Sequence, residues 1–179
     1  AKELKLENTK VKLDEKGFVK VDKSLMTTDK NIYAIGDVSE GLMLAHKASA
    51  QGKFVAELIA GEKVHYDRMI VPSVIFTDPE IAAVGLSEKE ADEEGIKVKT
   101  GKYPFSASGR AITKNKTEGF VKVIANSKDD KIIGVEIVGS DASDLISEAA
   151  LAIRLGATLE DVALTIHPHP TLSEGLMEA

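Results

Sequence analysis

Two histidines alternate with two prolines in the segment 165–174, close to the end of the printed sequence. Proline fixes φ and has no backbone N–H, so Pro168 and Pro170 exclude this segment from a helix interior and from a central strand. Either His-Pro bond also has the cis form open to it, which about 5–6% of X-Pro bonds in folded proteins adopt. The sequence therefore predicts a stiff loop that presents His167 and His169.

His169 is followed five residues later by Glu174. Histidine titrates near pH 6.5 and is the side chain that most often transfers protons near neutral pH, and a carboxylate can hold one of its ring nitrogens. On a continuous helix, residues five apart point about 140° away from each other, so a pair requires the chain to turn between them. The prolines favour that turn, and an acid/base pair is predicted.

Glu174 also fits a purely structural role. The run Thr171-Leu172-Ser173-Glu174 matches the Ser/Thr-x-x-Glu capping box ahead of the short segment 175–179. Local sequence favours the cap, and both interpretations stay open at this point. Alternating histidines can also indicate a metal site, but the chain has no cysteine and no matching cluster of His and carboxylates elsewhere, so no metal site is predicted.

A second landmark is a short β-prone run from Asn31 that ends in Gly36-Asp37. A carboxylate directly after a strand is well placed to bind a sugar hydroxyl. Residues 43–46 then lead into a predicted helix over 47–60, whose first N–H groups suit an electron-rich ligand edge. Many ordinary turns also carry Gly-Asp after a strand, so a plain turn is the alternative.

Together and in this order, the two landmarks resemble the flavoprotein disulfide reductases, also called the pyridine nucleotide-disulfide oxidoreductase family. The ending His-x-His-Pro-Thr-Leu-Ser-Glu resembles the lipoamide-specific form of the family signature, whereas the glutathione-specific members carry His-Pro-Thr-Ser. The resemblance covers nearly the whole chain, and its other segments are 33–37, 43–48, 71–80 and 148–152.

The resemblance implies an α+β fold in two parts. Residues 1–67 would form the C-terminal segment of an FAD-binding and central domain, and residues 68–179 an interface domain of antiparallel sheet plus helices that dimerises. In the first part, the family places FAD against five residues. Asp37 would bind the ribityl chain, and the pyrimidine end of the flavin would lie against Met43, Leu44, Ala45 and His46.

The resemblance also implies the chemistry. His169 would be the acid/base for the thiols of dihydrolipoamide, and Glu174 would orient it. Electrons would pass through a redox disulfide and FAD to NAD⁺. The histidine would serve the disulfide of the partner subunit, so the expected partners are an identical subunit and the lipoyl domain of a 2-oxo acid dehydrogenase complex. The cytoplasm is the expected location, with the mitochondrial matrix as the alternative.

Two interpretations compete with this one: a non-catalytic dimerisation module, and another family member such as a glutathione reductase. His169 and Glu174 favour the lipoamide enzyme over a module, because a purely structural domain has no need of the pair. The sequence contains no cysteine and no Gly-x-Gly-x-x-Gly motif, although the family needs both. The chain is therefore expected to be the C-terminal portion of a longer enzyme, inactive alone and binding FAD weakly or not at all.

Charge and hydropathy limit the other functions. The chain has 29 acidic and 23 basic residues, a net charge of −6 and no basic cluster, which argues against nucleic acid as a partner. Its apolar runs are too short to cross a bilayer.

The patterning also predicts the order of the elements. A hairpin over 11–21 and a strand from residue 31 precede the helix over 47–60, and a polar connector over 62–68 follows it. The second part is expected to group its strands, with helices packed on one side of them. Its predicted strands are 73–76, 97–105, 120–125 and 131–138, and its predicted helices are 87–94 capped by Ser87, 141–155, and 158–164 capped by Thr158.

Overall fold

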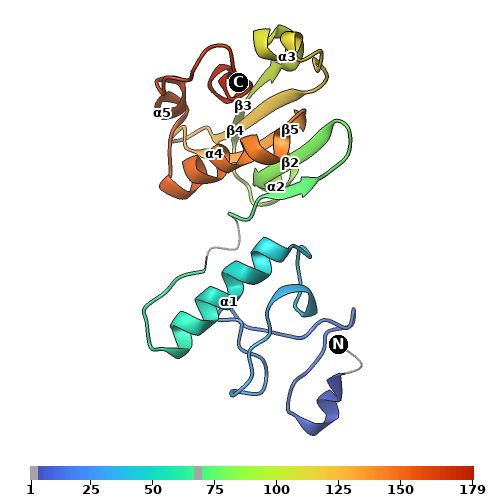
Figure 1. Cartoon of the computed structure of the whole chain (residues 1–179). Helices are drawn as coiled ribbons and strands as arrows, with labels where there is room; N and C mark the ends of the chain where they lie inside the picture. Colours follow the sequence, from blue (N-terminus) through green and yellow to red (C-terminus); the bar gives the residue numbers. More distant parts are fainter. Residues whose placement is uncertain (1–3, 67–69) are drawn as a thin grey trace. The chain divides into compact units, whose positions relative to one another are not determined.

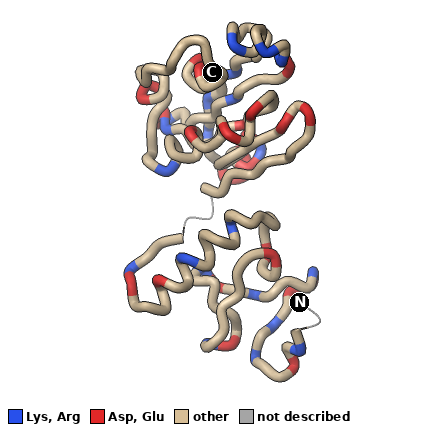
Figure 2. Tube along the Cα trace, viewed as in Figure 1, with Lys and Arg blue, Asp and Glu red and all other residues tan. Residues whose placement is uncertain are grey.

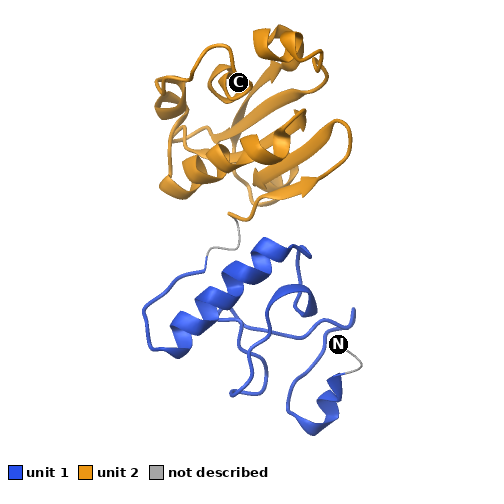
Figure 3. Cartoon of the chain, in the orientation of Figure 1, with its two compact units in different colours: residues 1–67 blue, residues 68–179 orange. Residues whose placement is uncertain are grey.

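The computed structural model of this chain describes residues 4–66 and 70–179, which fall into two compact units (Figure 3). Unit 1 comprises residues 1–67 and unit 2 residues 68–179. The predicted connector over 62–68 spans this division, and its residues 67 and 68 lie outside the described ranges.

Within residues 4–66, unit 1 shows the long helix α1 (Ala45–Ile59) and the 3₁₀ turns η2 (Leu6–Asn8) and η3 (Gly36–Val38) (Figure 1). The predicted helix over 47–60 is thus confirmed and begins two residues earlier. Leu25, Phe54 and Val55 form the buried core of the unit, and the ring of Tyr66 lies 5.6 Å from that of Phe54, measured between centroids.

β-pairing within residues 4–66 is limited to isolated bridges. The predicted hairpin forms only one, between Leu13 and Val19, at a turn that Asp14 closes by accepting the N–H groups of Lys16 and Phe18. The strand predicted from Asn31 to Asp37 is reduced to one antiparallel bridge, between Tyr33 and Met26. Its end is η3 instead, because the N–H of Gly36 donates to the side chain of Gln51 on α1 rather than to a neighbouring strand.

Unit 2 is built on a five-stranded antiparallel sheet. The four predicted strands are confirmed. A fifth, β2, was not predicted: it follows Pro79, and its alanines Ala82 and Ala83 give a weak strand signal. In the order in which they lie side by side, the strands are β1 (Ser73–Ile75), β2 (Glu80–Gly85), β5 (Ile132–Gly139), β4 (Phe120–Asn126) and β3 (Val98–Pro104).

Two helices cover one face of this sheet. The long helix α4 (Ala142–Leu155) contacts β2 and β5, and the short C-terminal helix α6 (Glu174–Glu178) contacts β3 and β4. Both contribute to a single core of alternating strand residues and helix residues, which includes Val121, Val123, Ile146 and Leu176. This core fixes α6, and with it the end of the chain.

The expectation that helices lie on one side only is wrong for α2 (Glu88–Glu93). Its Glu88 accepts a hydrogen bond from Lys122 at 2.8 Å. Side chains alternate along a strand, so Lys122 faces the side opposite the core residues Val121 and Val123.

The helix starts in unit 2 follow local sequence. Ser87 and Thr158 form complete capping boxes with Glu90 and Asp161, so both predicted caps are confirmed, on α2 and on α5 (Leu159–Ala163). The structure adds two short turns that were not predicted, η4 (Phe105–Ala107) and α3 (Gly109–Thr113).

Charged residues of both signs are interspersed along the described trace of each unit (Figure 2). None of the helices in the described ranges is both long and apolar enough to span a bilayer.

Candidate functional site

The loop between α5 and α6 carries His169, and the chain turns there. The His169–Pro170 peptide bond is cis. After the turn, Nδ1 of His169 lies 2.8 Å from Oε1 of Glu174. The structure therefore brings the two residues together that the sequence singled out.

Glu174 contacts His169 and also makes one half of the predicted capping box. While Oε1 contacts His169, Oε2 accepts the backbone N–H of Thr171 at 2.6 Å. The reciprocal capping box is not formed, because the hydroxyl of Thr171 donates to the carbonyl of Pro168 and the helix begins only at Glu174. The N–H of Thr171 and then the contact with His169 hold the pKa of Glu174 below its ordinary value, so the carboxylate is ionised at neutral pH.

The two side chains differ in their exposure to solvent. The side chain of His169 is 79% exposed, whereas that of Glu174 is 20% exposed. An ionised carboxylate only accepts hydrogen bonds, so Nδ1 of His169 donates, and in the neutral ring Nε2 carries the lone pair. The site thus offers an accessible base at Nε2 of His169.

A second imidazole–carboxylate pair lies two residues earlier in the loop. Nε2 of His167 lies 2.7 Å from Oε1 of Glu148 on α4, and its Nδ1 lies 2.8 Å from the carbonyl oxygen of Thr165. The side chain of His167 is only 4% exposed. Burial lowers its pKa, but the Thr165 carbonyl and the Glu148 carboxylate together outweigh burial, so the net pKa is raised.

Sequence reasoning assigned no role to His167 or Glu148. The two residues are 19 positions apart, and their contact depends on how α4 packs on the sheet. The available signal was that Glu148 begins the family-like segment 148–152.

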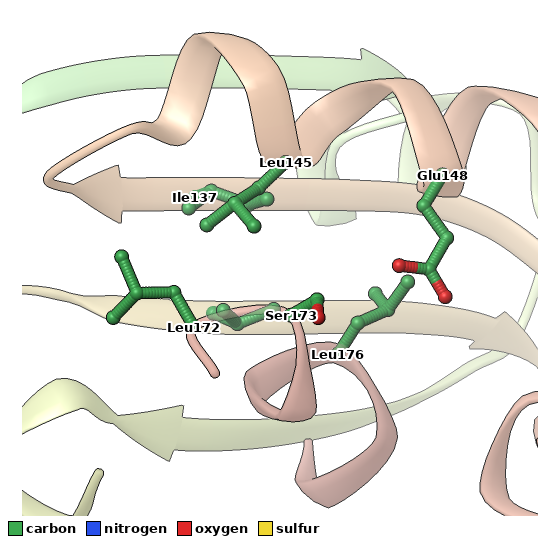
Figure 4. A pocket seen from close by; sticks show the side chains of 7 residues that line it. Ile137, Leu145, Glu148, Leu172, Ser173 and Leu176 are labelled. Atoms are coloured by element: carbon green, nitrogen blue, oxygen red, sulfur yellow. The ribbon is translucent and has the colours of Figure 1, made fainter. Parts of the chain in front are cut away.

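A small cavity of about 10 Å³ lies beside this second pair, between α4, α6 and the sheet (Figure 4). That volume is close to what a single water molecule needs, so the cavity is no site for an organic ligand. Its lining residues are Val121, Ile137, Leu145, Glu148, Leu172, Ser173 and Leu176.

In unit 1, the second landmark forms a surface around the start of α1. Asp37 is exposed on η3, and Met43 and His46 are exposed beside the helix start. No side chain caps α1 at Leu44. The first backbone N–H groups of the helix therefore point out of its N-terminal end and can donate to a ligand placed there. Gly36 is required here: a Cβ at this position would come within 3.0 Å of the Cβ of Ala48.

Lys47 is the residue of this surface that sequence reasoning missed. Its side chain is buried, and its Nζ has no hydrogen-bond partner among the described residues. A Cβ added to Gly41 would lie 3.6 Å from this Nζ. Burying an ammonium group without an acceptor is costly, so the position fits a ligand rich in oxygen acceptors. Within the described residues, no group of three or more His, Asp or Glu side chains is arranged to hold a metal ion.

Comparison with known families decides the assignment. Residues 71–179 match the family described as pyridine nucleotide-disulphide oxidoreductase, dimerisation domain. The chain belongs to this family. Residues 1–52 also match the pyridine nucleotide-disulphide oxidoreductase family.

Curated relatives within the family are dihydrolipoyl dehydrogenases. The enzyme of Bacillus subtilis (strain 168) is 51% identical over 177 residues, covering 99% of this chain and 38% of the relative. That of Thermus scotoductus is 52% identical over 176 residues, covering 98% of this chain and 38% of the relative. The chain therefore spans about 38% of the length of these relatives.

Solved structures of the family share the fold. LpdA from Mycobacterium tuberculosis is 33% identical with a TM-score of 0.91, covering 98% of this chain and 39% of that protein. The HOCl-induced flavoprotein disulfide reductase RclA from Escherichia coli is 30% identical with a TM-score of 0.85, covering 97% of this chain and 40% of that protein. The fold expected from the resemblance is confirmed.

Proposed function

We propose that this chain is the C-terminal portion of a dihydrolipoyl dehydrogenase, to which it supplies the His169–Glu174 acid/base pair and the dimer interface. The observation that carries the proposal is the exposed imidazole of His169 held by an ionised Glu174, in a chain about half identical to dihydrolipoyl dehydrogenases. The proposed substrate is the dihydrolipoyl group on the lipoyl domain of a 2-oxo acid dehydrogenase complex. The bacterial relatives favour the cytoplasm as its location.

Oxidising a dithiol to a disulfide releases two electrons and two protons, and the proposed pair handles the protons. A thiol has a pKa near 8.5 and a free imidazole one near 6.5, so transfer between them is uphill by roughly 2.7 kcal/mol. Nε2 of His169 accepts the proton, while the Glu174 carboxylate on Nδ1 stabilises the positive charge that forms on the ring. Glu174 thereby favours the transfer and fixes which nitrogen faces the thiol.

The electrons need groups that these 179 residues do not include, because the chain has no cysteine. FAD supplies the two-electron relay between thiols and NAD⁺ in the complete enzyme. Asp37 would hold its ribityl hydroxyls, and the N–H groups around Ala45 would face its pyrimidine oxygens. The buried Lys47 ammonium fits an oxygen-rich ligand beside them.

The dimer is supported by apolar side chains that unit 2 leaves exposed. Leu151 and Leu155 lie one turn apart on α4 and are both exposed. Single exposed apolar residues are common, whereas apolar side chains that lie together on one face are typical of an interface. The other large apolar side chains exposed in unit 2 are Ile75, Phe76, Ile81, Ile112, Leu164 and Ile166.

A segment exchange tests the proposal. Residues 1–179 replace the matching segment of the Bacillus subtilis dihydrolipoyl dehydrogenase, and the exchange is expected to bind FAD, dimerise and reduce NAD⁺ with dihydrolipoamide. His169→Gln in the exchange should lower turnover by roughly 10²–10⁴. The matched control is His65→Gln, an exposed histidine of unit 1, which should leave turnover unchanged. An exchange that folds with FAD and keeps its turnover after His169→Gln contradicts the proposal.

The proposed function and the non-catalytic alternative predict polypeptides of different mass in the native source. Intact mass spectrometry of the polypeptide that carries this sequence should give a mass well above 19.2 kDa, with flavin bound before denaturation. A mass near 19.2 kDa without flavin would favour a free-standing dimerisation module. Dihydrolipoamide and NAD⁺ added to the isolated chain should yield no NADH.

A further inference from the structure

Both ring nitrogens of His167 face acceptors. A carbonyl oxygen has no proton to donate, and an ionised carboxylate has none either. Nδ1 therefore donates to the Thr165 carbonyl and Nε2 donates to Glu148, at 2.8 and 2.7 Å. With Glu148 ionised, only the doubly protonated imidazolium can make both bonds, and the raised pKa of His167 agrees with this.

The groups around His167 favour that positive charge from two elements. Glu148 approaches from α4 at hydrogen-bond distance, and Glu174 acts on the ring electrostatically from α6. The ring is nearly excluded from water, so this ion pair is screened much less than one on the surface. Glu148 itself stays 37% exposed, which limits the cost of removing its carboxylate from water.

The pair joins the loop to a rigid element. Glu148 lies on the 14-residue helix α4, one residue before the buried Ala149, and its carboxylate points toward Leu176 of α6 (Figure 4). On the other side of His169, the buried Leu172 and Leu176 fix the chain in the core. The stretch between these two anchors is short and carries Pro168 and Pro170, so fixing both ends restricts the position of His169.

We propose that Glu148 and His167 form a positioning pair. The buried imidazolium of His167 binds Glu148 on α4 and thereby holds the loop that carries His169. Nδ1 of His169 then stays bonded to Glu174, and Nε2 stays free for the thiol. The catalytic meaning of this pair rests on the proposed function, whereas its geometry and protonation do not. His167 is buried, so in this scheme it acts on the substrate only through the exposed His169.

NMR of the imidazole nitrogens in the ¹⁵N-labelled 179-residue chain tests the proposal directly. A free imidazole loses its second proton near pH 6.5. In a pH titration, His167 is expected to keep both ring nitrogens protonated to a higher pH than a free imidazole, and the neutral form of His169 is expected to carry its proton mainly on Nδ1. A His167 ring that loses its second proton at or below the pH of a free imidazole would overturn the proposal.

Two variants separate positioning from stability. Glu148→Ala should shift His169 from the Nδ1–H tautomer toward the mixture that a free ring shows in water. Ile146→Val trims a fully buried side chain on the same helix and is the matched control: it should lower stability but leave the His169 tautomer unchanged. An unchanged tautomer in Glu148→Ala, or an equal change in Ile146→Val, would overturn the positioning role.

If Glu148→Ala does not fold, Glu148→Gln gives the answer, because its amide keeps the volume and can still bond a neutral ring. His167 should then lose its second proton at a lower pH than in the original chain, and an unchanged titration of His167 would contradict the proposal. None of these spectra depends on FAD, NAD⁺ or lipoamide. Failure here therefore leaves the segment exchange intact, and failure of the exchange leaves the protonation of His167 intact.

Discussion

The two units differ in how completely their polar groups are satisfied. Unit 2 closes five strands into one sheet and buries a continuous core beneath α4 and α6. Within the described residues of unit 1, pairing is limited to single bridges, the buried apolar cluster consists of Leu25, Phe54 and Val55, and the side-chain nitrogen of Lys47 has no hydrogen-bond partner. Unit 2 holds its acid/base pair by its own packing, whereas unit 1 presents groups that an oxygen-rich ligand would satisfy.

The largest expected effect is confined to the core of unit 2. Phe105 is 1% exposed, and its ring lies against Gly139 and Gly175, whose backbone cannot move in to fill a gap. Phe105→Ala should lower the free energy of unfolding of unit 2 by about 3–5 kcal/mol. Pulsed hydrogen exchange at increasing urea concentrations gives an unfolding midpoint for each peptide. Peptides from the two units therefore report the stability of each unit separately.

The matched control for Phe105→Ala is Phe76→Ala, which removes an exposed ring from the same unit and should change stability by no more than about 0.5 kcal/mol. Peptides of unit 1 should keep their midpoint in Phe105→Ala. An equal loss of unfolding free energy in both units would show that they unfold together. The two units would then not differ in stability in the way proposed.

A second test compares two glycines with similar backbone angles. Gly119 in unit 2 has φ +94, and a Cβ there would lie 1.8 Å from the carbonyl oxygen of Val138; Gly17 in unit 1 has φ +88 and open space. Gly17→Ala should cost about 1–2 kcal/mol from the left-handed backbone alone. Gly119→Ala should cost about 1–3 kcal/mol more, because β5 must move aside. Equal losses in urea unfolding would mean that the sheet yields freely where β4 begins beside β5.

The success of sequence reasoning follows the same division. The helix starts of unit 2 were predicted because Ser87 and Thr158 form their caps with residues only three positions away. The strand predicted from Asn31 in unit 1 keeps only a bridge at Tyr33, and its end at Gly36 was missed because the partner of Gly36 is Gln51, a side chain on a later helix. Local chemistry is visible in a sequence, and partners chosen by packing are not.

The site shows the same limit. His169 and Glu174 were predicted because they are close in sequence and the prolines on either side of His169 indicate a turn. His167 was visible, but its partner Glu148 was not, since the pair forms only once α4 lies on the sheet. Lys47 was hidden for a related reason: its burial depends on the fold of unit 1.

A third test removes the unsatisfied group of unit 1. Lys47→Met replaces a buried ammonium that has no partner in the described chain by an apolar side chain of similar length. Unit 1 of the isolated chain should gain about 1–3 kcal/mol, the cost of burying an unpaired polar group. Lys53→Met is the control on the same helix, where an exposed ion pair with Glu57 contributes only about 0.3–0.5 kcal/mol. A Lys47→Met chain no more stable than the original would show that the ammonium reaches water.

The smallest effect is a pH dependence inside unit 2. The folded pKa of His167 is raised, with Glu148 on α4 and Glu174 on α6 facing the ring. Its contribution to stability is therefore fully present below the unfolded pKa of about 6.5 and is lost as the pH rises through the higher folded pKa. In the original chain, the urea concentration at the midpoint of unit 2 unfolding should decrease as the pH rises from 6 to 9. The decrease should be smaller in Glu148→Gln. A slope of the opposite sign would mean that the buried ring is neutral in the folded protein. In that case unit 2 would also contain an unsatisfied polar contact, and the difference between the two units would be one of degree.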